Sequence, residues 1–285
     1  MRLVTFRLGG ESRVGVVVGD EVADIGAVDP RIAEMVDLIA AGSDRLAELA
    51  ASAAPVASLD DVQLLAPVRP KKNVFAVGRN YLEHVREVPG PDSATRPPPE
   101  NPIIFTKPPT SIIGPGEAIV TANDPSGTTD YEGELAVVIG RPGKRIPAPQ
   151  AWDHVFGYTI LNDVTARALQ RKHVQWVIGK GPDTFCPMGP WIVTVDALPD
   201  VTRSEVRTEV NGELRQRGSV ADLIFDIPTL IATLSRVMTL EPGDVIATGT
   251  PSGVGAGFDP PRYLWPGDVV SVSVDGIGTL TNPVI

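Results

Sequence analysis

Short apolar runs separated by glycine and proline constrain the fold of this chain more than any other feature. From residue 71 onward these runs include "NVFAVG", "PIIFTK", "GELAVVIG", "WIVTV" and "DVIATG", and "DVVSVSVDGIGTLTNPV" predicts a hairpin that turns at Asp275–Gly276. The 28 glycines and 28 prolines among 285 residues favour turns over long helices. Helices are expected to be few in this part of the chain, with one over about 164–172 and another from an N-cap at Asp226. We therefore predict an α+β fold that is mostly β.

The first 68 residues predict a small unit of their own. Residues 1–25 alternate strand-like runs with glycine turns, which is typical of an antiparallel meander. A second short helix is expected with Ser43 as its N-cap. Before it, apolar residues recur at helical spacing, at Ile32, Met35, Val36 and Ile39. The sequence "APVRP" marks a boundary, so we predict an N-terminal α+β cap domain, 1–68, and a larger domain, 69–285.

Charge and composition exclude several classes of protein. The net charge is −10 and no basic block is present, which argues against nucleic-acid binding. No apolar run approaches the ~18 residues that a membrane span needs, and the first residues lack the apolar core of a signal peptide. The single cysteine, Cys186, excludes a disulfide within the chain. We expect a cytoplasmic protein.

The stretch "TTDYEGELAVVIG", residues 128–140, contains the least expected polar residues. It predicts a strand on which Glu132 and Glu134 share one face with the apolar residues that follow. One interpretation is a solvated face with basic neighbours. The other is a cation site, because two carboxylates at this spacing reach one ion, and all-oxygen ligands suit Mg²⁺, Mn²⁺ or Ca²⁺. Gly133 between them indicates a bulge or close packing on the opposite face.

A third carboxylate is found in "ILNDVTARALQRK". Asp163 ends an apolar strand, and on the helix expected next, Asp163, Arg167 and Gln170 fall at i, i+4 and i+7, on one face. This pattern fits an N-cap followed by a helical ion pair. The alternative is a metal ligand beside an arginine that binds an anion and a glutamine that forms a hydrogen bond.

The segment "VGRNYLEHVRE", residues 77–87, places His84 and Glu87 at i and i+3. On a helix the two side chains face the same way, so the carboxylate can orient the imidazole as a general base. A surface ion pair is the alternative. The proline-rich segment 88–102 follows at once and predicts a loop, and its position next to this pair favours a lid.

Two glycine-containing segments suggest close approach to a ligand. Lys180 lies between two glycines, either facing a ligand or in a solvated turn, and residues 247–257, "ATGTPSGVGAG", follow a strand as a candidate loop of backbone donors. No G-x-S-x-G motif is present. Cys186 is expected to be packed, and His154 and His173 to be structural.

Together, six segments in order resemble the fumarylacetoacetate hydrolase family over roughly residues 70–285. They are "VGRNYLEHVRE", "YEGELAVVIG", "GYTILNDVTAR", "GKGPDTFCPMGP", "VNGELRQ" and "ATGTPSGVG". The resemblance implies a mixed β-roll catalytic domain behind a variable N-terminal cap. It also implies a homodimer with the active site near the interface.

The resemblance assigns a role to each candidate residue. Mg²⁺ or Mn²⁺ is expected on Glu132, Glu134 and Asp163. The catalytic residues are expected to be His84 and Glu87, on a lid, and Lys180. Substrate contacts are expected from Arg167, Gln170 and Thr250. The sequence departs from the family pattern at Arg79, where leucine is common, and at Gly181–Pro182, where Ser-Phe is common.

The implied function is hydrolysis of carbon–carbon bonds in β-diketo acids, of the acylpyruvate or fumarylpyruvate type, through a metal-stabilised enolate. The small-molecule substrate would chelate the metal through its 2-oxo acid end, with Lys180 and Arg167 offsetting its charge. The same site fits a 2-hydroxyhepta-2,4-diene-1,7-dioate isomerase, an oxaloacetate decarboxylase or a sugar-acid dehydratase. A non-catalytic ligand-binding protein is the alternative of another class.

Overall fold

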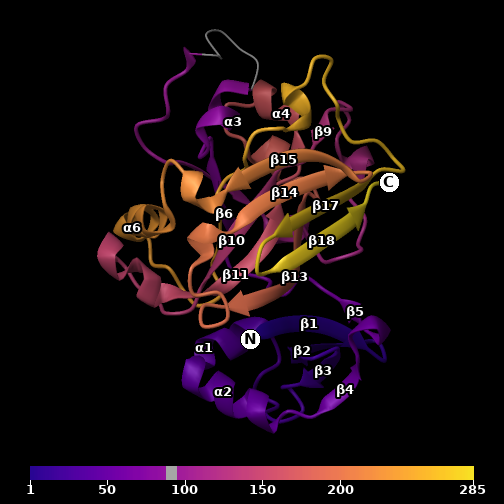
Figure 1. The fold of residues 1–285 in the computed structure, drawn as a ribbon, viewed down its shortest axis with the longest axis vertical. Helices are drawn as coiled ribbons and strands as arrows, with labels where there is room; N and C mark the ends of the chain where they lie inside the picture. Colours follow the sequence, from indigo (N-terminus) through magenta and orange to yellow (C-terminus); the bar gives the residue numbers. More distant parts are fainter. Residues whose placement is uncertain (88–94) are drawn as a thin grey trace.

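The computed structural model describes residues 1–87 and 95–285, and these are built mainly from strands with a few short helices (Figure 1). The predicted α+β class, mostly β, is confirmed. No helix in the described ranges is long and apolar enough to cross a membrane.

Within the described residues, twelve strands form one large sheet and two smaller sheets lie beside it. Ten of the large sheet's strands form a continuous order: β4 Pro55–Ser58, β3 Glu21–Asp24, β2 Glu11–Val18, β1 Arg2–Leu8, β13 Cys186–Thr194, β11 Val155–Asn162, β10 Gly133–Ile139, β16 Val245–Ala247, β6 Val74–Gly78 and β7 Ile103–Lys107. Two short strands pair off this path, β5 Gln63–Leu64 with β1 and β8 Ile112–Ile113 with β13. The four-stranded sheet has the order β15 Glu213–Ser219, β14 Glu205–Val210, β17 Val269–Val274 and β18 Gly278–Pro283. The two-stranded sheet pairs β12 Thr165–Ala166 with β9 Thr129–Asp130.

The N-terminal meander is confirmed, since β1, β2 and β3 pair antiparallel in sequence order. Tight turns at Gly9–Gly10 and Gly19 join them, and these glycines adopt positive φ angles. The helices α1 Met35–Ala41 and α2 Ser43–Ser52 follow. Ser43 is the first residue of α2 and not its N-cap, because the chain turns one residue earlier, at Gly42 with φ 84°.

The large sheet continues from the N-terminal strands into the rest of the chain. Arg2 pairs with Val193 and Leu3 with Ile192, so β1 and β13 are neighbours. Figure 1 shows the N-terminal strands with α1 and α2 gathered next to β13. The division into domains at residue 68 stays a prediction.

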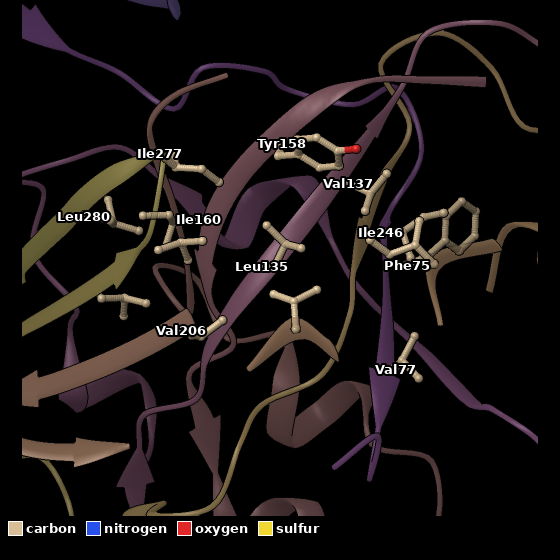
Figure 2. Close-up of a cluster of buried hydrophobic side chains, with 14 of the residues drawn as sticks. Phe75, Val77, Leu135, Val137, Tyr158, Ile160, Val206, Ile246, Ile277 and Leu280 are labelled. Carbon is tan, nitrogen blue, oxygen red and sulfur yellow. The ribbon is translucent and has the colours of Figure 1, made fainter. Parts of the chain in front are cut away.

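Strand β10 lies in the middle of the molecule and is buried on both faces. Leu135 and Val137 belong to the larger hydrophobic cluster, which also takes side chains such as Val206 and Leu280 from the four-stranded sheet (Figure 2). The alternate residues of β10 belong to a second cluster, with side chains of the N-terminal helices. This explains the continuous apolar run after Glu134, because neither face of the strand meets water.

The glycine before that run is required by close packing. A Cβ at Gly133 would collide with Thr208 Oγ1 and with Val272 Cγ1 of the four-stranded sheet. Of the two alternatives for Gly133, close packing is therefore correct. The register shift of β10 against β11 lies at the other end, between Val138 and Ile139.

We expect Gly133→Ala to destabilise the protein by about 1–3 kcal/mol, because this part of the core cannot accept another methyl group. Thermal unfolding should show a fall in Tm of about 2–4 °C for each kcal/mol. Adding Thr208→Ala removes the nearest colliding atom and should recover part of the loss. An unchanged Tm in Gly133→Ala would contradict the packing argument.

The helices of the larger part are short. They are α3 Leu82–Glu87, α4 Arg167–Lys172, α5 Val177–Lys180 and α6 Ile227–Val237. The N-cap of α6 is confirmed, because Asp226 Oδ1 accepts a hydrogen bond from Thr229 N–H at 2.9 Å. The helix predicted over 164–172 begins only at Arg167, because Thr165–Ala166 pair with β9 as a strand. The hairpin turn at Asp275–Gly276, between β17 and β18, is also confirmed.

Candidate active site

The three carboxylates predicted to bind a metal lie together at one end of the β10–β11 pair. Glu134 is the second residue of β10, Glu132 comes just before that strand, and Asp163 directly follows β11. The strands run antiparallel with Gly133 opposite Asn162, so the start of one lies beside the end of the other. All three side chains are buried, and one oxygen of each lies within 4.8 Å of the others.

Glu132 reaches this position differently from the prediction. The strand expected over residues 128–140 is interrupted, since β9 ends at Asp130 and β10 begins at Gly133. The backbone N–H of Glu132 donates to the side-chain oxygen of Asn162 at 3.0 Å, in place of a ladder partner. The prediction of one continuous strand carrying both glutamates is therefore wrong.

The placement of Asp163 on a helix with Arg167 and Gln170 is also wrong. Asp163 lies in the loop between β11 and β12, and only Arg167 and Gln170 belong to α4. Arg167 nevertheless reaches the carboxylates, because its Nη1 lies 2.6 Å from Glu132 Oε1. The same Nη1 also donates to Gln170 Oε1 at 3.3 Å.

Buried cations surround the three carboxylates. Lys180 Nζ lies 2.6 Å from Glu132 Oε2 and 2.5 Å from Asp163 Oδ2. Lys107 Nζ lies 2.7 Å from Asp163 Oδ1, but its hydrogen bonds point to the carbonyl oxygens of Val164 and Lys180. Asp163 Oδ1 therefore lacks a directed hydrogen bond, although it is fully buried.

These cations affect the pKa values of the carboxylates unequally. Burial alone would raise the pKa of Glu132, but Lys180 and Arg167 outweigh it and lower that pKa far below its usual value. Burial raises the pKa of Glu134 well above its usual value, and the neighbouring Asp163 and Glu132 raise it further. Glu134 accepts one hydrogen bond, from Gly249 N–H at 2.7 Å, and has no ion pair among the described residues.

The predicted pair of His84 and Glu87 forms on α3. His84 Nδ1 lies 2.7 Å from Glu87 Oε1, and the imidazole is buried. The second oxygen of Glu87 accepts from Gly253 N–H at 2.7 Å, so the loop after β16 fixes this carboxylate. Residues 88–94 of the predicted lid lie outside the described residues.

One cavity of about 300 Å³ joins these groups. It is lined by His84, Glu132, Glu134, Arg167, Gln170, Lys180 and Thr250. Asp163 and Glu87 lie behind this lining, in contact with Lys180 and His84. His173, which was interpreted as structural, is exposed and lines the cavity as well, whereas Cys186 is buried as expected.

Thr250 is more constrained than the sequence suggests. Its hydroxyl donates to the carbonyl oxygen of Gly133 at 3.0 Å and accepts from Gln216 Nε2 at 2.7 Å. One lone pair of the hydroxyl remains to face a ligand. The same contacts fix the start of β10, so Thr250 also helps to position Glu134.

Residues 73–285 match the family model of the fumarylacetoacetate (FAA) hydrolase C-terminal domain. The chain belongs to the fumarylacetoacetate hydrolase family. The match begins just before β6 and covers all of the carboxylates, cations and loops described above.

Relatives in this family cover the whole chain. Oxaloacetate tautomerase YisK of Bacillus subtilis (strain 168) is 44% identical, with all of both chains aligned. The solved structure of a fumarylacetoacetate hydrolase from psychrophilic Exiguobacterium antarcticum is 44% identical, with a TM-score of 0.85 over 100% of this chain and 99% of that one. A maleylpyruvate hydrolase from Sphingobium sp. SYK-6, solved with manganese(II) and pyruvate, is 34% identical, with a TM-score of 0.81 and the same coverage. The family is thus one of enzymes that includes hydrolases and tautomerases.

Sequence reasoning missed two members of this buried charge network. Asp130 accepts from Arg167 Nε at 2.7 Å and from the backbone N–H groups of Gly255 and Ala256. It fixes the arginine and also the loop after β16. Lys107 forms a buried ion pair with Asp163. The available signals were a lysine ending an apolar strand and a third acid within "TTDYEGE", and neither is specific alone.

Proposed function

We propose that the chain is a divalent-metal-dependent hydrolase that cleaves carbon–carbon bonds of β-diketo acids, such as acylpyruvates. The observation that carries the proposal is that the His84–Glu87 pair and the carboxylates of the candidate metal site meet at a single cavity. A general base and a cation site in one small space fit a reaction in which water attacks a polarised carbonyl group.

The carboxylates fit a hard divalent cation. Their oxygens are close together and buried, and the pKa of Glu134 is raised by burial and by its acidic neighbours. An all-oxygen set of this kind suits Mg²⁺, Mn²⁺ or Ca²⁺. Bound there, the metal would supply Lewis-acid stabilisation of the enolate charge that develops on a 2-oxo acid.

The charge balance of the site suits an anionic substrate. With all four carboxylates ionised, the buried groups carry one more negative than positive charge, counting Asp130, Glu132, Glu134 and Asp163 against Lys107, Arg167 and Lys180. A bound divalent cation would make the net charge of the site positive. The site then attracts the carboxylate of a 2-oxo acid, and Arg167, Gln170 and Thr250 are the proposed contacts.

His84 is the proposed general base. A carboxylate only accepts hydrogen bonds, so Nδ1 carries the proton in its 2.7 Å contact with Glu87, and Nε2 is left basic. Nε2 takes a proton from water, and Glu87 stabilises the imidazolium that forms. Gly253 N–H holds the other oxygen of Glu87 and keeps the pair aligned.

The proposed reaction breaks one carbon–carbon bond of the substrate. The hydroxide formed from water bonds to the distal carbonyl carbon, and the bond between that carbon and the pyruvate methylene carbon breaks. The electron pair stays with the pyruvate fragment as an enolate, which takes back the proton that His84 removed from water. Although burial opposes it, the pKa of Lys180 is raised by Asp163 and Glu132, so Lys180 is cationic and suited to stabilise the oxyanion formed at attack.

A second candidate is keto–enol tautomerisation of oxaloacetate. The full-length identity of 44% to a named oxaloacetate tautomerase favours it. The same imidazole would move a proton between carbon and oxygen of the 2-oxo acid, without attack by water. The two reactions share the enolate and differ in whether a carbon–carbon bond breaks.

We expect chelator-treated protein to be inactive and to recover on addition of Mg²⁺ or Mn²⁺. The recovered enzyme should convert an acylpyruvate to equal amounts of pyruvate and the matching carboxylic acid, both measured by chromatography. Oxaloacetate is assayed in parallel for keto–enol interconversion. Interconversion of oxaloacetate with no cleavage of any acylpyruvate would reject the hydrolase and support the tautomerase.

The homodimer implied by the family resemblance stays a proposal. It is supported by exposed apolar side chains on and next to α5, namely Val174, Val177 and Ile178, which are 93%, 42% and 50% exposed. These residues lie beside the cavity, since Val174 lines it.

A further inference from the structure

Two arginines line the cavity without taking part in any contact described so far. Arg79 directly follows β6, and Arg96 lies in the segment that leads to β7. Among the described residues, neither forms an ion pair with a carboxylate. Arg96 Nη1 donates to the carbonyl oxygen of Val85 at 3.2 Å, which leaves its other N–H groups for a ligand.

The remaining buried cations of the cavity are already engaged. Arg167 contacts Asp130 and Glu132, and Lys180 contacts Glu132 and Asp163, all at 2.5–2.7 Å. Arg79 and Arg96 therefore differ from these two in having no counter-charge within residues 1–87 and 95–285. An anion in the cavity is the missing partner, because a half-buried guanidinium without one is costly.

The electrostatics around Arg79 support this distinction. Burial and the neighbouring Arg96 lower the pKa of Arg79, and no carboxylate acts in the opposite direction. The carboxylates of the candidate metal site therefore do not offset its charge. The two arginines form a cationic region of the cavity that is separate from the metal-binding carboxylates.

The backbone at Arg79 also carries strain. Its φ is 58°, in the left-handed region that a side chain other than glycine, asparagine or aspartate rarely adopts. The next residue is held in place, since the Asn80 side chain donates to the carbonyl oxygens of Phe225 and Thr248 and accepts from the N–H of Phe225. An arginine kept in a strained position at a cavity wall indicates that its side chain is used there.

We propose that Arg79 and Arg96 bind the second carboxylate of a dicarboxylic 2-oxo acid. The inference rests on the proposed function, in which the metal end of the cavity binds the 2-oxo acid group. It narrows the substrates to 2-oxo acids whose far end is also a carboxylate. Two guanidinium groups suit such an end, because each can form paired hydrogen bonds with its oxygens.

Arg171 also lines the cavity but is a weaker candidate. It is exposed on α4, so water and salt screen its charge. Its contribution is expected to fall with ionic strength more steeply than that of the half-buried pair. The proposal therefore depends on Arg79 and Arg96 alone.

The test measures binding and does not need turnover. Calorimetry on the Mn²⁺-loaded protein compares ligands that differ only in a far carboxylate or methyl group. The pairs are 2-oxoglutarate with 2-oxopentanoate, and 2-oxoadipate with 2-oxohexanoate. We expect the dicarboxylate of at least one pair to bind about 10-fold to 100-fold more tightly, as charge-assisted hydrogen bonds allow.

The variants Arg79→Met and Arg96→Met should each reduce this preference at least about threefold and leave the affinity for the monocarboxylate unchanged. Arg79→Lys keeps the charge and should keep part of the preference. The control is Arg141→Met, which removes one positive charge beyond the opposite end of β10 and should keep the full preference. Unchanged monocarboxylate binding shows that a variant is folded.

Equal affinity within both pairs, failure of both dicarboxylates to bind, or a full preference in both methionine variants would overturn the proposal. The proposed reaction can fail separately. Arginine-dependent preference in a protein that turns over no acylpyruvate or oxaloacetate would reject that reaction and support the carboxylate site. Turnover of such a substrate without any preference for the dicarboxylates would support the reaction and reject the carboxylate site.

Discussion

His84→Ala should lower kcat about 100-fold or more, whichever reaction of the proposed substrate is measured. Glu87 orients the imidazole at the cavity wall, and alanine leaves no group there to take the proton from water or from carbon. Steady-state kinetics on the metal-loaded enzyme provide kcat and KM. Metal affinity, measured by calorimetry, should stay within a few fold, because His84 is not among the candidate ligands.

The chain offers a matched control in His154. Its Nδ1 lies 2.9 Å from the carbonyl oxygen of Arg141, next to the far end of β10, and it does not line the cavity. His154→Ala should therefore leave kcat unchanged. A His84→Ala enzyme with wild-type kcat would remove His84 from the mechanism, and a parallel loss of metal binding would indicate a structural role.

Local sequence patterns predicted those features that depend on neighbours in the chain. The i, i+3 spacing placed His84 against Glu87 because one helical turn is sufficient to join them. Asp226 was identified as an N-cap because its partner, Thr229, is three residues away. The apolar run of β10 was sufficient to predict a strand there.

Where prediction failed, a distant group replaced the expected local partner. The strand was expected to continue through Glu132, but the side chain of Asn162 accepts its N–H. The helix was expected to begin after Asp163, but Thr165–Ala166 pair with β9 instead. Neither competing partner is visible in the local periodicity.

The charge network was the least predictable part of the site. Arg167 and Asp130 are 37 residues apart in sequence, and the fold alone makes them neighbours. Lys107 and Asp163 likewise meet only because their strands end at the same place. The resemblance identified the candidate ligands by motif, but the cations that hold them became apparent only in three dimensions.

Glu134→Gln should have opposite effects on the metal-free and the metal-bound protein. Burial, Asp163 and Glu132 raise the pKa of Glu134 in the folded metal-free state, so its ionised form opposes folding there. Below the ordinary pKa of about 4.3 the group is protonated in both states and has no effect. As pH rises above that value, the unfolded state releases the proton first and stability falls.

The metal-free variant should therefore unfold at a higher temperature than wild type at pH 7, and the difference should shrink towards pH 4. Each kcal/mol of relieved repulsion corresponds to about 2–4 °C in Tm. Glutamine keeps the acceptor for Gly249 N–H, so the hydrogen bond is not lost with the charge. Calorimetric scans of chelator-treated protein at several pH values measure this difference.

Added Mn²⁺ should reverse the order of the two melting temperatures. A ligand of the folded state stabilises it in proportion to the logarithm of its concentration over Kd, and losing one carboxylate should weaken Kd by more than about 10-fold. Glu21→Gln is the control, since Glu21 is exposed on β3 and its change should alter neither curve. If the variant were less stable without metal and gained as much from Mn²⁺ as wild type, Glu134 would not be a ligand. Both effects have the same cause, which is the negative charge of Glu134. Without metal this charge is repelled by Asp163 and Glu132 and destabilises the fold, and with metal it attracts the cation.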